Sequence, residues 1–308
     1  MRFLKPIGFL LILITCEIQA TAWNRVGHME SAAIAYREMS PAMRSRIFPI
    51  LGQHPNYPVW RQDYESLRPS LPNSVDIGMY IFMRASVWPD DIRGTSSSFD
   101  KPKWHLMSYP LRAPSFPLEP PLDAGENLLY GISETERIIT NPQSDPIIRA
   151  VSLSYLIHLV ADIHQPLHCV TLIDQKFPNG DKGGTTFYVR SGPYVGRLHS
   201  FWDSLGGLDH NVTEIVEAVV RIEQEYSRAG LNELLTEIGP DQWALESRDI
   251  AIRDVYLNGN LKGAASPNSA HALPRSYQAT ARLVTYRRIA LSGYRLSDLL
   301  NQLLKVKK

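Results

Sequence analysis

The segment from Asp145 to Gln165 constrains the fold most, because its apolar residues leave almost no polar face for a helix. Asp145 is a suitable N-cap, and Pro146 suits the first helical position. A helix that is apolar nearly all round is buried at the centre of a protein. The sequence therefore predicts an all-α fold, with a single helical domain built around this segment.

A histidine and an aspartate lie one helical turn apart in this segment, and the same pair at the same spacing recurs later in the chain. His158 and Asp162 form the first pair, His199 and Asp203 form the second, and His168 lies between them. Residues four apart share one helix face. A single buried histidine is more often a hydrogen-bonded core residue, and each aspartate could instead pair with an arginine. A metal would satisfy both imidazole and carboxylate, and this ligand set suits Zn²⁺.

The remaining periodicity predicts a mostly helical chain without internal repeats or a domain boundary. Residues 53–78 are rich in proline and are expected to be irregular, and residues 95–121 are expected to form a long loop. Residues 174–197 are expected to form a loop or hairpin around one short strand, Thr185–Arg190. The further helices are predicted over residues 24–38, 41–51, 123–140, 211–228, 241–257 and 274–304, with a short one at 199–203.

Residues 1–22 are typical of a secretory signal peptide. Arg2 and Lys5 precede a short apolar run, and small residues end the segment at Ala22. A lipoprotein signal ending at Cys16 is the alternative, although Thr15 before this cysteine is a poor match. Cleavage after Ala22 would make residues 23–308 the mature chain, so we expect a secreted or periplasmic protein.

The charge of the mature chain excludes one way of attracting a polyanion. Removal of residues 1–22 takes away Arg2, Lys5 and Glu17, so the formal net charge falls from +1 to zero. The mature chain therefore has no globally basic surface to attract nucleic acid, and local positive charge from a metal cluster would be needed. Cys169 is the one cysteine left, so no intrachain disulfide is possible.

Several motifs occur in one order along the chain and carry a family resemblance. They are Trp23–His28, Trp88-Pro-Asp90-Asp-Ile-Arg93, Trp104-His105, His158–His168 and Leu198–Asp203. Together they resemble the S1/P1 nuclease family of zinc-dependent nucleases that prefer single strands. The resemblance covers essentially the whole of residues 23–308.

The resemblance implies a cluster of three zinc ions. The implied ligand sets are Asp90, His105, His158 and Asp162 for one zinc, His168, His199 and Asp203 for another, and the α-amine and carbonyl of Trp23 with His28 and Asp162 for a third. Asp162 would then bridge two metals. Asp90 is preferred to Asp91 by its place in the motif. His164 lies between the candidate ligands and is interpreted as a structural or supporting residue.

The same resemblance implies a reaction. Phosphodiester bonds of single-stranded DNA and RNA would be hydrolysed to 5′-phosphorylated products, and 3′-mononucleotides would be substrates of a 3′-nucleotidase activity. Hydroxide formed at the zinc cluster would be the nucleophile. Another zinc would stabilise the leaving 3′ oxygen, and Arg93 would contact the transition-state oxygens. We expect a monomer without stable membrane association.

Two positions depart from the pattern of the resembling family. Leu106 stands where fungal members have an aromatic residue that stacks on a base, and Thr185 stands where the family has asparagine. Both departures concern base recognition and leave the metal ligands intact. Other aromatic residues could supply stacking, although each is individually more typical of core packing: Tyr109, Phe187, Tyr188 and Tyr194.

Two alternatives remain open at this point. A zinc phospholipase C has a similar three-zinc site and N-terminal Trp, and it would use exposed apolar surface, for which Leu106 and Met107 are candidates. A metal-binding protein without catalysis would need the ligands but no open coordination position. The Trp88-x-Asp90-x-x-Arg93 motif favours the nuclease over both alternatives, because Arg93 beside the ligands suits a phosphate substrate.

Overall fold

A computed structural model describes residues 23–112, 120–236 and 238–304. The predicted signal peptide, residues 1–22, lies outside the described residues. The structure is mainly helical and forms a single domain, which confirms the predicted fold class. Its helices are α1 (Arg25–Glu38), α2 (Pro41–Leu51), α3 (Tyr57–Leu67), α4 (Ile77–Asp91), α5 (Leu128–Thr140), α6 (Pro146–Asp162), α7 (Leu198–Asp203), α8 (Val212–Glu225), α9 (Pro240–Ile250) and α10 (Tyr277–Leu303).

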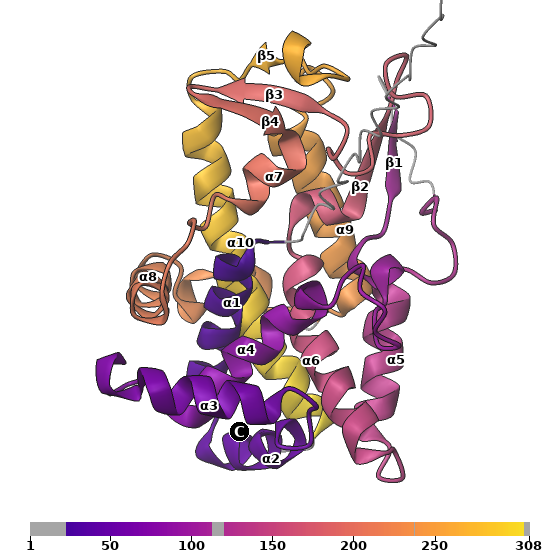
Figure 1. The fold of residues 1–308 in the computed structure, drawn as a ribbon. Helices are drawn as coiled ribbons and strands as arrows, with labels where there is room; N and C mark the ends of the chain where they lie inside the picture. The colour runs from indigo at the N-terminus through magenta and orange to yellow at the C-terminus, as the bar shows by residue number, and fades with distance from the viewer. Residues whose placement is uncertain (1–22, 113–119, 237, 305–308) are drawn as a thin grey trace, which may run out of the picture.

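The apolar helix predicted first in the sequence is α6, and it lies at the centre of the structure. The side chain of Asp145 accepts hydrogen bonds from the backbone N–H groups of Ile147 and Ile148, as expected of an N-cap. Every residue from Ala150 to Asp162 is buried. Helices α4 and α5 pack directly against α6, and α1 packs against α4 and α10 (Figure 1). One large apolar cluster joins α1, α4, α6 and α10.

Two small sheets lie outside the helical body. Strands β1 (Tyr109–Arg112) and β2 (Val170–Ile173) pair in parallel. Strands β3 (Tyr188–Ser191) and β4 (Tyr194–Arg197) form a hairpin where a loop or hairpin around one strand, Thr185–Arg190, was expected, and β5 (His271–Ala272) pairs with β3. In Figure 1 the β3–β4–β5 sheet stands at the opposite end of the molecule from α2 and α3. Within the described ranges, no helix combines the length and apolar character needed to cross a membrane.

The expectation that residues 53–78 are irregular was wrong. Helix α3 occupies Tyr57–Leu67 in this segment. Pro58 falls in its first turn, where proline needs no hydrogen-bond partner for its nitrogen. Trp60 and Tyr64, one turn apart, are the buried face that attaches α3 to α4.

Three smaller boundaries also differ from the predictions. The 95–121 loop contains β1, which forms because β2 supplies its hydrogen-bond partners. The helix expected from residue 123 begins at Leu128, because Asn127 caps it. The helix expected over 241–257 changes to a π-helical turn, Ala251–Val255, after α9.

Candidate metal centre

The candidate ligands come from elements far apart in the sequence, and the fold brings them to one buried place. His28 lies in the first turn of α1, Asp90 lies at the end of α4, and α6 contributes its last turn. The other ligands lie on short elements next to these helices. Seven of the candidate ligands have an exposed fraction of 4% or less: His28, His105, His158, Asp162, His168, His199 and Asp203.

The first group consists of His105, His158 and Asp162. The Oδ2 atom of Asp162 lies 3.2 Å from the Nδ1 atom of His105 and 3.2 Å from the Nε2 atom of His158. The two ring nitrogens lie 2.9 Å apart. Asp90 faces this group as well, with its Oδ1 atom 3.8 Å from both nitrogens.

Asp162 also faces a second set of atoms with its other oxygen. The Oδ1 atom of Asp162 lies 3.4 Å from the Nε2 atom of His28, which in turn lies 3.9 Å from the Oδ2 atom of Asp90. The rings of His28 and His158 stack at 3.9 Å. Because its oxygens divide between two sets of nitrogens, the Asp162 carboxylate has the arrangement of a bridging ligand. Asp90 divides its two oxygens in the same way.

The third group consists of His168, His199 and Asp203. The Nε2 atoms of the two histidines lie 3.2 Å apart, and Asp203 places its Oδ2 atom 3.6 Å from the Nε2 atom of His199. In each of the three groups, His28–Asp90–His158, His105–His158–Asp162 and His168–His199–Asp203, the potential ligand atoms lie within 4.8 Å of one another.

The contacts inside these groups suit a cation. Ring nitrogens face each other in two of the groups, at 2.9 Å between His158 and His105 and at 3.2 Å between His168 and His199, which are positions where a cation could lie between lone pairs. Both ring nitrogens of His28 and the Oδ1 atom of Asp162 are buried without a hydrogen-bond partner. Buried polar atoms normally have partners, and a metal ion would supply the missing partner of the Asp162 Oδ1 atom and of the His28 nitrogen that faces it, Nε2.

Backbone carbonyl groups orient three of the rings. The Nδ1–H groups of His158, His168 and His199 donate to carbonyl oxygens at 2.7, 2.7 and 2.6 Å. The acceptors are Ser86, His105 and Gly183, respectively. These bonds leave each Nε2 atom for the site, which is the usual arrangement around protein-bound metals. His105 differs, because it turns Nδ1 toward the first group.

Burial sets the protonation of most of these groups. It lowers the pKa of His28, His105 and His168 well below the ordinary value, and it lowers the pKa of His199 to about 4. These rings are therefore neutral near pH 7, as ligands must be. Burial also raises the pKa of Asp162, to about 6. A cation would offset that effect by favouring the carboxylate.

The side chains of Asp90 and its neighbour Asp91 point in different directions. Asp91 points outward and pairs with Arg25 at 2.6 Å, whereas Asp90 faces the histidines. The guanidinium of Arg93 lies on the same side as Asp90, with its Nη1 atom 3.5 Å from the Asp90 Oδ1 atom. Arg93 thus lies at the edge of the ligand groups with most of its side chain buried.

Trp23 lies beside the ligand groups at the start of the described chain. It is fully buried, and its indole N–H donates to the carbonyl oxygen of Ala161 at 3.1 Å. The next residue, Asn24, donates its backbone N–H to the carbonyl oxygen of Asp203 at 3.3 Å. Trp23 is therefore tied to α6 through its side chain, and the peptide bond that follows it is tied to α7.

His164 does not join the ligands. Its Nδ1–H donates to the carbonyl oxygen of Val160, and its Nε2 atom accepts from Arg295 at 2.9 Å. These contacts hold the ring against Arg295 of α10, in agreement with a structural or supporting residue.

Sequence reasoning missed Gln165, which is fully buried. Its side-chain N–H donates to the Oδ1 atom of Asp203 at 2.7 Å. A polar side chain immediately before Pro166, within the ligand-rich segment, was the signal that could have identified it.

The aromatic candidates for base stacking divide into two kinds. Phe187 is 2% exposed and packs between Phe177 and Tyr256, so it belongs to the core. Tyr109, Tyr188 and Tyr194 are half-buried. Met107, a candidate for apolar surface, is fully buried.

Comparison with known proteins agrees with the geometry. The sequence profile of the family described as S1/P1 Nuclease matches residues 23–305. Endonuclease 2 of Arabidopsis thaliana is 27% identical over 161 residues, which cover 49% of this chain and 51% of the relative. Endonuclease 4 of the same plant is 27% identical over 171 residues, covering 51% of each chain. The chain thus spans about half the length of the curated relatives it matches.

Proposed function

The chain belongs to the S1/P1 nuclease family, and from this membership we propose that it is a zinc-dependent endonuclease. It hydrolyses phosphodiester bonds of single-stranded DNA and RNA to 5′-phosphorylated products, and it acts on 3′-mononucleotides as a 3′-nucleotidase. The observation that carries the proposal is the Asp162 carboxylate, whose two oxygens face two separate sets of histidine nitrogens.

The proposed zinc ligands follow the three groups of atoms. One zinc is held by Asp90, His105, His158 and Asp162, and another by His168, His199 and Asp203. The third is held by His28, Asp162 and the backbone amine and carbonyl of Trp23, once Trp23 is the first residue. Support comes from the buried and unpartnered atoms of His28 and Asp162. Since Asp90 also faces His28, it could ligate either neighbouring zinc.

When bound, zinc supplies positive charge and lowers the pKa of water to about 7. The protein's own residues then hold the substrate in position. The three carboxylates leave such a cluster with about +3 formal charge, which attracts a phosphate. Arg93, held beside Asp90, would donate to the phosphate oxygens as negative charge develops on them.

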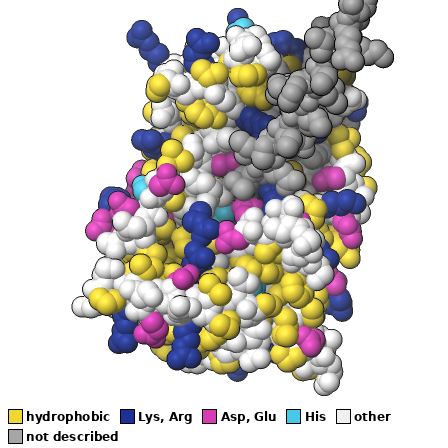
Figure 2. Space-filling model, viewed as in Figure 1, with side chains coloured by type: hydrophobic (Ala, Val, Ile, Leu, Met, Phe, Trp, Pro, Cys, Tyr) yellow, Lys and Arg dark blue, Asp and Glu magenta, His cyan; other side chains and the backbone are white. Residues whose placement is uncertain are grey.

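Local charge is needed because basic and acidic residues nearly balance in the chain, with 32 Lys and Arg against 31 Asp and Glu. Lys and Arg side chains are interspersed with Asp and Glu on the face shown in Figure 2. A nucleic acid would therefore bind through the cluster and its rim. We further propose that the protein is secreted or periplasmic, acts as a monomer and has no stable membrane association.

The test is an assay of the mature protein on single-stranded DNA, RNA, 3′-AMP and phosphatidylcholine, with and without a chelator. Release of 5′-phosphorylated products from the nucleic acids, abolished by chelator and restored by Zn²⁺, is expected. Hydrolysis of the lipid without any nucleotide release would refute the proposal and favour the phospholipase alternative. Matched duplex DNA measures the strand preference.

A further inference from the structure

We propose that Asp181 and Tyr256 are positioning residues for the His168–His199–Asp203 group, because together they hold the loop that orients His199. The inference rests on the proposed function in that zinc is taken as the metal of this group. Neither residue is a ligand candidate.

The loop contacts His199 through two carbonyl oxygens. The Gly183 oxygen accepts the ring Nδ1–H at 2.6 Å, and the Gly184 oxygen accepts the backbone N–H at 3.3 Å. The first bond decides which ring nitrogen carries the proton. The Nε2 atom is therefore left toward His168, 3.2 Å away.

The backbone of this loop has three successive residues with positive φ angles. Lys182, Gly183 and Gly184 have φ angles of 54°, 61° and 81°. The left-handed region is unfavourable for a residue other than glycine, and Lys182 adopts it. A Cβ atom at Gly183 would collide with the carbonyl oxygen of Leu167. The loop is thus packed tightly against the chain beside His168. A residue that anchors the loop at this close approach also fixes the position of the Gly183 carbonyl.

Asp181 supplies that anchor from a fully buried position. Its Oδ1 atom accepts the backbone N–H of Leu172 at 2.9 Å, and its Oδ2 atom accepts the hydroxyl of Tyr256 at 2.6 Å. Its own backbone N–H donates to the Leu172 carbonyl oxygen at 2.9 Å, and its carbonyl accepts the Thr186 hydroxyl at 3.1 Å. The carboxylate therefore joins the loop to β2.

Tyr256 connects the same carboxylate to another part of the fold. It is 1% exposed, follows the π-helical turn Ala251–Val255, and packs its ring edge-on against Phe187. The path thus runs from the Tyr256 hydroxyl through Asp181 and the Gly183 carbonyl to His199. Loss of a group that hydrogen-bonds directly to a metal ligand typically reduces metal affinity about 10–100-fold, and these two residues act on His199 through such a group, the Gly183 carbonyl.

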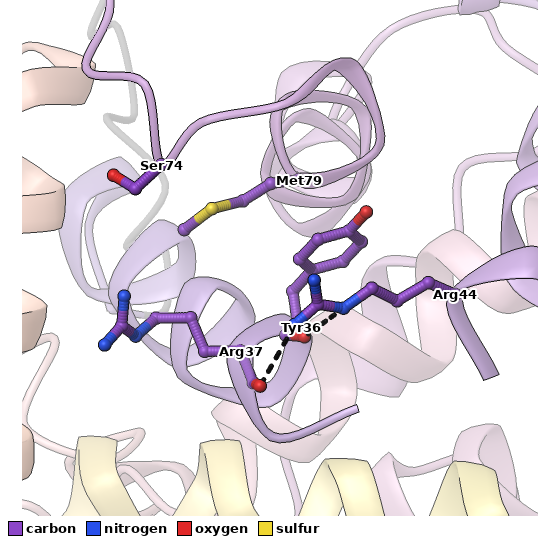
Figure 3. Close-up of a pocket in the computed structure, with 5 residues that line it drawn as sticks. All are labelled: Tyr36, Arg37, Arg44, Ser74 and Met79. Atoms are coloured by element: carbon purple, nitrogen blue, oxygen red, sulfur yellow. Dashed lines mark hydrogen bonds between the residues drawn. The ribbon is translucent and has the colours of Figure 1, made fainter. Parts of the chain in front are cut away.

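The experiment uses two variants of the mature protein, Tyr256→Phe and Asp181→Asn. Their zinc affinity is measured by competition with a chromophoric chelator. Tyr36→Phe is the matched control. Its hydroxyl also donates to a carboxylate, Asp76, at 3.0 Å, and it lines the pocket of Figure 3. Tyr36 lies two turns beyond His28 on α1, about 12 Å away.

We expect the affinity for one of the bound zinc ions to fall about 10-fold in both test variants, the lower end of the range for a direct partner of a ligand. The control should bind all its zinc as the wild type does. As a second readout, NMR of ¹⁵N-labelled histidine should show a protected Nδ1–H on His199 in the wild type and the control. That signal should exchange faster in the two test variants.

Unchanged zinc affinity and an unchanged His199 signal in both test variants would overturn the inference. So would an equal loss of zinc in the control, because the effect would then reflect general stability. A wild type that binds zinc but cleaves no nucleic acid refutes the proposed function and leaves this inference standing. A wild type that binds no zinc refutes both.

Discussion

Gln165 donates a buried hydrogen bond of 2.7 Å to the Oδ1 atom of Asp203. The other side-chain atom of Gln165, its amide oxygen, accepts the backbone N–H of Leu167 at 2.5 Å, which fixes the orientation of the amide. Asp203 is therefore left with its Oδ2 atom directed toward His199, at 3.6 Å. One residue of the turn before His168 thus determines which carboxylate oxygen is available to a metal.

Gln165→Met should weaken the zinc site that includes Asp203, because methionine has a similar length and no N–H donor. We expect a loss of about 10–100-fold in zinc affinity or in kcat/KM. Metal content by mass spectrometry and steady-state kinetics on single-stranded DNA would measure it. Gln62→Met, at an exposed position of α3, is the control. Equal kinetics and metal content in both variants would show that the bond to Asp203 is dispensable.

Asp162→Asn should remove most activity, because this carboxylate faces two sets of histidine nitrogens. We expect bound zinc to fall from three ions to about one and kcat/KM to fall about 10³-fold, equivalent to about 4 kcal/mol. Asp91→Asn is the matched control, because Asp91 points outward toward Arg25. If the Asp162 variant kept all its metal, the bridging role would be excluded.

The sequence allowed the central part of the fold to be predicted because its signals are local. The apolar run of α6 and the N-cap at Asp145 are properties of a single segment. The His158 and Asp162 pair follows from helix geometry alone. Their convergence with Asp90 and His105 came from resemblance, since nothing local determines how distant segments pack.

The missed features depend on partners that lie far away in the sequence. Strand β1 forms because Tyr109 pairs with Val170, which lies far away in the sequence, so a local sequence pattern cannot predict the strand. Helix α3 was not predicted because its segment is rich in proline, although Pro58 falls in the first turn, where proline is tolerated. The bond from Gln165 to Asp203 and the contact of Tyr256 with Asp181 likewise join segments that only the fold brings together.

Arg295→Met should reduce stability without removing zinc. Arg295 donates to His164 at 2.9 Å and to both oxygens of Glu246, at 2.6 and 2.9 Å. Removing one partner of a buried ion pair costs about 3–5 kcal/mol, and Glu246 retains Arg288 as a second partner, so we expect the lower end of this range. Urea unfolding and metal analysis would measure both quantities. Loss of zinc with normal stability would contradict the supporting role of His164.

The free energy of unfolding should depend on pH through the protonation of Asp181. Burial raises its pKa from 3.8 to about 6, so between these values the folded state binds a proton that the unfolded state releases. Its contribution is therefore complete below about pH 4 and is lost as the pH rises through 6, by roughly 3 kcal/mol. Chelator-treated wild type should lose this much stability relative to Asp181→Asn between about pH 4 and 7. A constant difference in unfolding free energy would contradict the assignment.

A residue added before Trp23 should remove the third zinc and most activity. In the proposed site the free α-amine of Trp23 is a ligand, and an added residue converts it into an amide, which binds zinc poorly. The indole bond to Ala161 and the Asn24 bond to Asp203 hold Trp23 against α6 and α7, which limits how far the amide can move aside. Mature protein beginning at Trp23 and a version with one preceding alanine would be compared by metal analysis and by cleavage of single-stranded DNA. The same alanine added after Lys308 is the control. Three zinc ions and full activity in the N-terminally extended protein would show that His28 and Asp162 hold their zinc without the amine.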